Sequence, residues 1–306
     1  MKRERAIKTS SKSIQVSGRL VRVARLEAEG YLFLEEHPQR LLDELRRCGR
    51  RIDLFTFTQR VPETRPKYEY PMEWDNCAAI LVSTFDQWWK QQIRGEARNR
   101  ARQAGKHGVM VREVPFDEAL VRGIWDIYNE TPVRGGRRFP HYGEDLQTVF
   151  EEEATYLDRS CFIGAFLNDA LIGFVKLTMD ETGTQANLMN ILSMMKHRDK
   201  APTNALIAGS VRACAERKIS YLVYQRFSYG KKGADGIVKF KEVNGFKQFD
   251  LPRYYVPLTS LGRTALRLGL HHAWKDRLPE SIAERLRGIR SAWYNRRFQV
   301  ARETAP

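Results

Sequence analysis

The chain has 306 residues, of which 42% are hydrophobic, and its formal net charge is +15. This length can bury the core of one large domain or of two small ones. No apolar run approaches the roughly 18 residues of a membrane span, and the basic start lacks the apolar segment of a secretory signal. The four cysteines lie far apart without a CxxC pair. We therefore expect a cytoplasmic protein without a metal site, and a mitochondrial presequence is the alternative for the basic start.

The excess of 52 basic over 37 acidic residues indicates anionic partners. Nucleic acid, a phosphorylated ligand and an anionic membrane surface all fit such a charge, because it concentrates anions around the protein. The charge carries no information about the fold.

The first part of the chain predicts a small α/β arrangement. Residues 1–13 are basic, and we expect them to be disordered. Period-two alternation and turn residues then indicate the following order: strands at 18–26 and 30–36, a helix at 37–49 closed by Gly49, a strand at 51–61, a Pro-rich loop at 61–76 and a short buried strand at 78–83.

A long helix is predicted from Phe85 to Gln103, since Thr84 and Gln87 have capping-box spacing. Its notable feature is a line of three arginines at a spacing of four: Arg94, Arg98 and Arg102. Without intervening acids these side chains repel one another, and an anionic partner such as nucleic acid would relieve that repulsion. An ordinary solvated helix face is the alternative.

The second part is more regular. After a strand at 109–114, apolar periodicity and turn signals predict this order: helices at 117–130 and 144–157, strands at 162–166, 170–179 and 187–195, a helix at 205–216, a strand at 219–227, a short helix that ends in NGF at 244–246, a strand at 249–258, and two helices in the tail. Three antiparallel strands followed by a β-α-β unit predict a mixed sheet. Where the pairing changes from antiparallel to parallel, the sheet can split and open a cleft.

This order, together with FKEVNGF at 240–246, resembles the GNAT superfamily, the acyl-CoA N-acyltransferase fold, over residues 109–258. The stretch WWKQQIRGEARNRARQAGKHGVMVREV, at 88–114, resembles FemABX-like aminoacyl and peptidyl transferases, which are built from GNAT-like halves. The resemblance implies an α/β (α+β) fold with a mixed, mostly antiparallel sheet flanked by helices. It also implies a reduced GNAT-like half at 14–108, a GNAT-like acyltransferase domain at 109–259 and a basic amphipathic tail at 260–306.

In GNAT proteins a glycine-rich loop before a helix binds the coenzyme A pyrophosphate through backbone N–H groups. The matching run here, residues 198–203, has the arginine but lacks both glycines, and Pro202 has no N–H. We expect side chains to replace the backbone donors, namely Arg198, Lys200, Thr203 and Asn204. The resemblance leaves two anionic donors, acyl-CoA and aminoacyl-tRNA. An ordinary connection with Thr203 or Asn204 as N-cap is the alternative.

The loop at 130–143 is the densest polar cluster of the chain. By the resemblance it covers the amine acceptor, with Glu130 or His141 as the base. The expected acceptor-binding side chains are Arg134, Arg137, Arg138 and Tyr142. The alternative is an exposed basic connector.

The acid that protonates the leaving group is the last expected role. Many GNAT enzymes carry a tyrosine at the place where this chain has Lys241. A lysine acts as an acid only if its surroundings adjust its pKa. Tyr224 and Tyr229 are the other candidates.

The sequence therefore predicts an acyl- or aminoacyl-transferase that moves a group from an anionic carrier to an amine. A non-catalytic RNA-binding protein on the same scaffold is the contrasting hypothesis. A third is an enzyme that contacts a membrane surface through the tail and acts on a lipid or cell-wall precursor.

Overall fold

The computed structural model describes residues 5–8, 13–27, 29, 38–228, 236–272 and 292–294. Three expectations lie outside the described residues: the strand at 30–36, most of the second tail helix, and the position of Tyr229. No helix within the described ranges is both long and apolar enough to cross a membrane.

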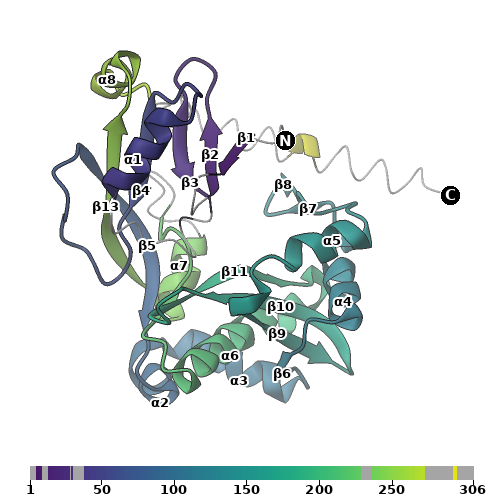
Figure 1. The fold of residues 1–306 in the computed structure, drawn as a ribbon. Helices are drawn as coiled ribbons and strands as arrows, with labels where there is room; N and C mark the ends of the chain where they lie inside the picture. The colour runs from purple at the N-terminus through teal and green to yellow at the C-terminus, as the bar shows by residue number, and fades with distance from the viewer. Residues whose placement is uncertain are drawn as a thin grey trace.

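The described strands form one large mixed sheet and one small hairpin (Figure 1). The strands of the first part are β1 (Arg5–Lys8), β2 (Ser13–Ser17), β3 (Val23–Leu26), β4 (Leu54–Thr58) and β5 (Met72–Leu81). Those of the second part, from residue 109 on, are β6 (Met110–Val114), β7 (Val133–Arg134), β8 (Arg137–Arg138), β9 (Ser160–Leu167), β10 (Ala170–Met179), β11 (Gln185–Ser193), β12 (Tyr221–Val223) and β13 (Lys247–Pro257).

The order in the large sheet is β1-β2-β3-β4-β13-β5-β12-β11-β10-β9-β6. Only β3/β4 and β11/β12 pair in parallel, so the predicted mixed, mostly antiparallel sheet is confirmed. The strand β5 of the first part lies between β12 and β13 of the second part, so the two parts share this sheet. The domain boundaries drawn from the sequence stay a prediction.

The helices are α1 (Pro38–Arg47), α2 (Phe85–Gln87), a π-helical turn η1 (Trp88–Gln92), α3 (Gly95–Lys106), α4 (Glu118–Asn129), α5 (Leu146–Glu153), η2 (Leu157–Arg159), η3 (Met195–Lys200), α6 (Pro202–Glu216), α7 (Gly236–Val243) and α8 (Ser260–Arg267). Asp117 and Asp145 cap α4 and α5 by accepting backbone hydrogen bonds from Leu120 and Thr148. Helix α4 packs on β10, while α6 packs on β9, β10 and β11 and carries α3 on its outer side.

The buried side chains form two main clusters. The larger one joins α4, α6 and strands β9 to β11, and the predicted apolar stripes of both helices lie in it. The smaller one places α1 against β2, β3, β4 and β13, with Leu42, Phe55 and Tyr254 fully buried. Each fully buried apolar side chain of this size contributes about 1.5–3 kcal/mol.

The predicted long helix at 85–103 is wrong, because the chain breaks at Ile93 and Arg94. Both residues have extended backbone angles between η1 and α3. The Arg94 N–H donates to the carbonyl of Val243 at 2.9 Å instead of continuing a helix. Arg98 donates to the carbonyls of Lys90 and Ile93, so the expected row of three equivalent arginines does not exist.

Two further expectations need correction. Strand β5 begins at Met72, inside the segment predicted to be a Pro-rich loop, because residues 72–79 pair with β13 along their whole length. Residues Arg5–Lys8 form β1 and pair with β2, although no structure was expected before residue 14. The sequence Asn168-Asp169, which predicts a turn between the strands at 162–166 and 170–179, forms that turn, since both residues have positive φ between β9 and β10.

Candidate active site

The mixed sheet splits between β11 and β12. These strands pair at only three positions, from Gln185 opposite Tyr221 to Asn187 opposite Val223. Beyond this point β11 continues to Ser193 without pairing to β12. The chain after β12 stays with β5 instead, since Tyr224 donates to Ala78 at 2.8 Å. The expected parting of the two strands is therefore present.

Lys241 lies beside the segment that follows β12, where the chain stays with β5. It projects from α7, and its side chain is fully buried. Its Nζ donates to the carbonyl of Arg226 and lies 4.6 Å from the centroid of the Tyr224 ring. Burial lowers the pKa of Lys241 to about 8, because a buried ammonium loses its hydration. The lysine in the expected acid position thus has a pKa close to neutral pH.

The residues expected to bind the donor lie in one segment, but their side chains make different contacts. The Thr203 hydroxyl bonds the Ser193 hydroxyl at 2.8 Å, which ties the start of α6 to the end of β11. Asn204 is buried and donates to the Asn244 side chain at 3.1 Å. Neither is the N-cap of α6, which is Ala201. Arg198 is exposed, and Lys200 contacts Asp199 at 2.9 Å.

Glu130 and Arg134 join the expected acceptor loop to the expected donor segment. The two Glu130 oxygens accept from the backbone N–H groups of Met195 and Lys196, at 2.7 and 2.9 Å. Arg134 donates to Glu130 at 3.1 Å and to the Ser193 carbonyl at 2.8 Å. Burial lowers the pKa of Arg134, although Glu130 opposes the change. These contacts hold the acceptor loop against the donor segment. They occupy most of the hydrogen-bonding groups of Glu130 and Arg134, so few are left to bind an acceptor.

The rest of the acceptor loop is a hairpin. Gly135 and Gly136 have positive φ and form the turn between β7 and β8. Arg137 and Arg138 are exposed on β8. Tyr142 follows the hairpin and is 37% exposed.

His141 is oriented by two carboxylates. Its Nδ1 lies 2.9 Å from Glu144 and 3.2 Å from Glu152, and its ring stacks on Tyr128 at 4.5 Å. A carboxylate at Nδ1 favours the tautomer with its proton there, which leaves Nε2 free to accept a proton. The contacts of His141 therefore suit the expected base.

A buried polar network beneath this loop was not expected from the sequence. Tyr128 and Asn190 both donate to Glu153 Oε1 at 2.7 Å, and Lys176 donates to the Glu153 carbonyl at 2.7 Å. Burial raises the pKa of Glu153 and lowers that of Lys176. The network ties α4 and α5 to β10 and β11.

A cavity of about 320 Å³ adjoins the parting on the sheet surface and was also missed. Strands of both parts line it, and Gln185 and Asn187 of the paired end of β11 are among the lining residues. Arg253 is 2.8 Å from Asp75 and 3.0 Å from Glu29, and Arg226 also contacts Asp75 at 3.0 Å. Burial would raise the pKa of Asp75, but the two arginines hold it below its usual value.

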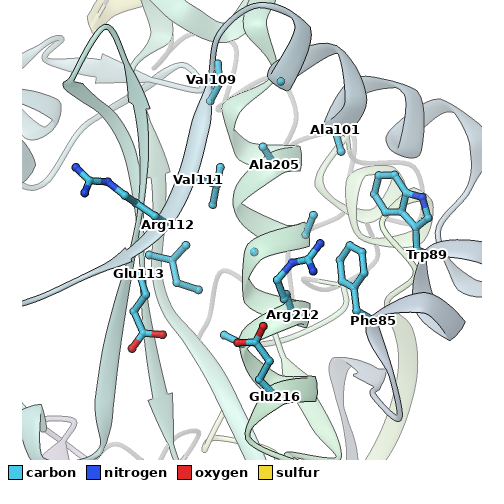
Figure 2. Close-up of a pocket in the computed structure, with 15 residues that line it drawn as sticks. Phe85, Trp89, Ala101, Val109, Val111, Arg112, Glu113, Ala205, Arg212 and Glu216 are labelled. Atoms are coloured by element: carbon cyan, nitrogen blue, oxygen red, sulfur yellow. The ribbon is translucent and has the colours of Figure 1, made fainter.

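A second cavity, of about 530 Å³, lies between α3, α6, β6 and β9 (Figure 2). Small and apolar side chains such as Ala101, Val111 and Ala205 line it, and Arg212 stacks over Phe85 at 4.0 Å. It contains none of the residues expected to act in catalysis or binding. The cavity of about 320 Å³ contains none of them either, but Arg226, whose carbonyl accepts a hydrogen bond from Lys241, lines it. The parting with this adjoining cavity is therefore the better candidate.

No protein-family model matches the chain, and no curated protein matches its sequence. Solved structures do resemble it. L-PGS from Bacillus licheniformis has a TM-score of 0.56 and 14% identity, covering 86% of this chain and 87% of that one. FemX has a TM-score of 0.53 and 11% identity, covering 81% and 86%. The C-terminal domain of a protein assigned as a lysylphosphatidylglycerol synthetase, from Agrobacterium fabrum, has a TM-score of 0.53 and 12% identity, covering 87% of both chains.

These similarities are to folds, because every identity is below 15%. The chain has a GNAT-like fold, with FemABX-like proteins among its structural relatives, as the sequence predicted.

Proposed function

We propose that the protein is a transferase that moves an acyl or aminoacyl group from an anionic carrier to an amine. The observation that carries the proposal is the buried Lys241, with a pKa of about 8, beside the segment that follows β12. The fold supports it, and so does the name lysylphosphatidylglycerol synthetase, which describes attachment of a lysyl group.

In the proposed reaction, the amine nitrogen attacks the carbonyl carbon of the donor and an amide bond forms. The ester or thioester bond to the carrier breaks, and the leaving oxygen or sulfur takes a proton from Lys241. His141 receives the proton that the amine loses. Acid–base help of this kind contributes typically about 10²- to 10⁴-fold to the rate, and positioning contributes the larger share.

Aminoacyl-tRNA is the donor that we favour over acyl-CoA. Helix α6 begins with Ala201 and Pro202 where a pyrophosphate would need close glycine backbone and free N–H groups. Thr203 and Asn204 point into internal contacts and so add little to a phosphate site. The net charge of +15 suits a large polyanion better than a single pyrophosphate.

Incubation of the full chain with labelled aminoacyl-tRNA or labelled acyl-CoA, and with a panel of amines, tests both parts of the proposal. We expect turnover with aminoacyl-tRNA and a loss of about 10²- to 10⁴-fold in kcat for Lys241→Met. Lys239→Met is the matched control, because Lys239 is exposed on the same helix. No turnover with either donor would contradict the transferase proposal, and full activity of Lys241→Met would contradict the role given to Lys241. Turnover with acyl-CoA alone would correct the donor.

The net charge favours a second candidate, a non-catalytic nucleic-acid-binding protein. Of the three arginines expected to serve it, Arg94 and Arg102 are exposed, whereas Arg98 is held by backbone carbonyls. RNA binding that weakens steeply with salt, without turnover of any donor, would support this candidate.

Membrane contact through the tail remains a further proposal. The described part of the tail, α8 and the residues after it, exposes Leu261 and Leu268 beside Arg263 and Arg267. Flotation of the full chain with anionic liposomes, compared with Leu261→Ser/Leu268→Ser, tests this contact. Equal flotation of the two proteins would count against it.

A further inference from the structure

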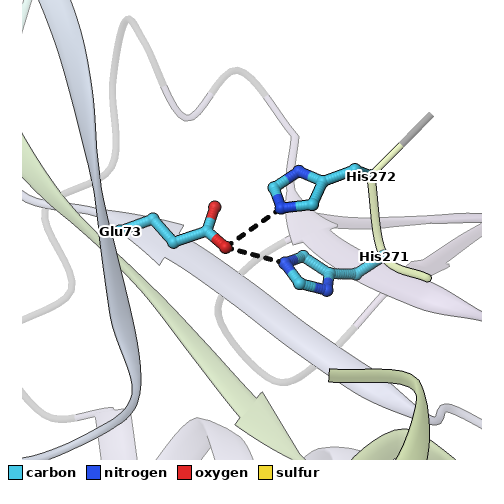
Figure 3. Close-up of side chains that lie close together, drawn as sticks. All are labelled: Glu73, His271 and His272. Atoms are coloured by element: carbon cyan, nitrogen blue, oxygen red, sulfur yellow. Dashed lines mark hydrogen bonds and ion pairs between the residues drawn. The ribbon is translucent and has the colours of Figure 1, made fainter. Parts of the chain in front are cut away.

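Three potential metal ligands from distant parts of the chain converge at one point (Figure 3). Glu73 projects from β5, whereas His271 and His272 follow α8. The Nε2 atoms of the two histidines lie 3.0 and 3.1 Å from the same oxygen, Oε1 of Glu73. All three ligand atoms are within 4.8 Å of one another.

We propose that Glu73, His271 and His272 form a binding site for a divalent transition metal such as Zn²⁺. Two imidazole nitrogens and one carboxylate oxygen are a donor set that zinc accepts, with one position left for water or another ligand. In a tetrahedral site with bonds of about 2.0–2.1 Å, neighbouring ligand atoms lie about 3.3 Å apart. The two nitrogen–oxygen separations, 3.0 and 3.1 Å, are within a few tenths of an ångström of that value, and the two nitrogens lie within 4.8 Å of each other, so side-chain rotations admit the ion.

The surroundings favour an ion over a simple hydrogen-bonded cluster. Both imidazoles are directed to one carboxylate oxygen, and their ring centroids are only 4.0 Å apart. The His271 side chain is 3% exposed, and its ring packs 4.6 Å from that of Tyr255. Among the described residues, the buried Nδ1 of His271 has no hydrogen-bond partner, so the only polar interaction holding this ring is at Nε2. A cation between the three ligand atoms would attract all three, whereas without it two imidazole rings crowd one carboxylate oxygen.

The site would fasten the segment after α8 beside the cavity of about 320 Å³. Glu73, Asp75 and Cys77 project from the same face of β5, because alternate residues of a strand share a face. Asp75 and Cys77 line that cavity. Arg253, which also lines it, is the cross-strand neighbour of Glu73 in β13. The proposal concerns metal binding at one end of this face and is independent of the proposed transfer reaction.

Calorimetric titration of the chelator-treated full chain with ZnCl₂ tests the site. We expect one ion per chain, with binding that weakens on acidification because the ligand histidines must lose their protons. Glu73→Gln and His272→Ala should each weaken binding by at least about 100-fold, since even the loss of an outer-shell partner costs about 10- to 100-fold. His107→Ala is the matched control, because His107 is exposed at the end of α3. Circular dichroism confirms that each variant is folded.

Visible absorption of the Co²⁺-loaded protein provides a second readout that reports tetrahedral coordination directly. Intense bands in the native protein and in His107→Ala, but not in Glu73→Gln, would support the site. Absence of binding to the native protein would overturn the proposal. So would an ion that Glu73→Gln retains, including one lost only in His141→Ala, which would place it at the other group of ligands, His141, Glu144 and Glu152.

Discussion

Replacing Lys241 by methionine should make the protein more stable by an amount that depends on pH. Burial lowers the pKa of Lys241 from 10.5 to about 8. The difference between the two pKa values corresponds to roughly 3 kcal/mol against the charged form, at about 1.36 kcal/mol per pH unit. Methionine keeps most of the volume and removes this penalty. It also leaves the Arg226 carbonyl without its donor, which costs about 1–3 kcal/mol.

The sign of the pH dependence follows from the order of the two pKa values. Below about pH 8 Lys241 is charged in both states, so the native protein carries the whole penalty. Between about pH 8 and 10.5 the unfolded chain binds the proton and the folded chain does not, so the penalty disappears as the pH rises. The stability of Lys241→Met relative to the native protein should therefore fall by roughly 3 kcal/mol across this window.

Urea unfolding of both proteins at intervals between pH 7 and 10.5 measures this difference, and the contributions of other titrating groups cancel in it. Lys239→Met is the matched control for the loss of a lysine from α7, because Lys239 is exposed. A difference for Lys241→Met that does not change with pH would refute the argument, because it would mean that Lys241 has an ordinary pKa in the folded protein.

Three other substitutions test the contacts around the site. Glu130→Gln should lower the free energy of unfolding by about 1–3 kcal/mol, since one of two backbone N–H groups loses its charged acceptor. Urea unfolding measures this loss, and hydrogen exchange at residues 194–197 should become faster. Asp75→Asn should lower the free energy of unfolding by up to about 3–5 kcal/mol at neutral pH, because it leaves the mostly buried Arg253 without one of its two carboxylate partners. This cost should vanish as the pH falls through the lowered pKa of Asp75, and an unchanged cost in acid would contradict the ion-pair explanation. Gly245→Ala should lower the melting temperature, because φ is +87° and a Cβ would lie 3.0 Å from the Trp88 ring nitrogen; an unaltered melting temperature would show that this close approach relaxes.

Local patterns were sufficient for most of the second part of the fold. The apolar stripe of α4 and the positive-φ turn at Asn168 and Asp169 follow from residues that are close together in the sequence. The order of these elements also predicted where the sheet splits, since a β-α-β unit after an antiparallel run obliges one pair to be parallel. Such features depend on short-range sequence alone.

The break at Ile93 shows where local patterns fail. Trp89, Ala97 and Ala101 keep helical spacing across it, so periodicity alone indicates one helix. The break is imposed from outside, by the hydrogen bond of Arg94 to Val243 and by Gly245, which lies against the Gln92 backbone. These partners are about 150 residues away in the sequence, and no window along the chain brings them together.

The same limit applies to the candidate site. Thr203 and Asn204 were correctly placed at the start of α6, but the direction of each side chain depends on Ser193 and Asn244. Asp75 lies in the segment predicted to be a Pro-rich loop and Arg253 lies in the strand predicted at 249–258. The two become a pair only because β5 lies beside β13 in the sheet. Insertion of a strand from the first part between two strands of the second is therefore what creates the charged cavity next to Lys241. A protein built from the second part alone would lose both the cavity and the strand β5 that holds the chain after β12 away from β11, so the candidate site requires both parts of the chain.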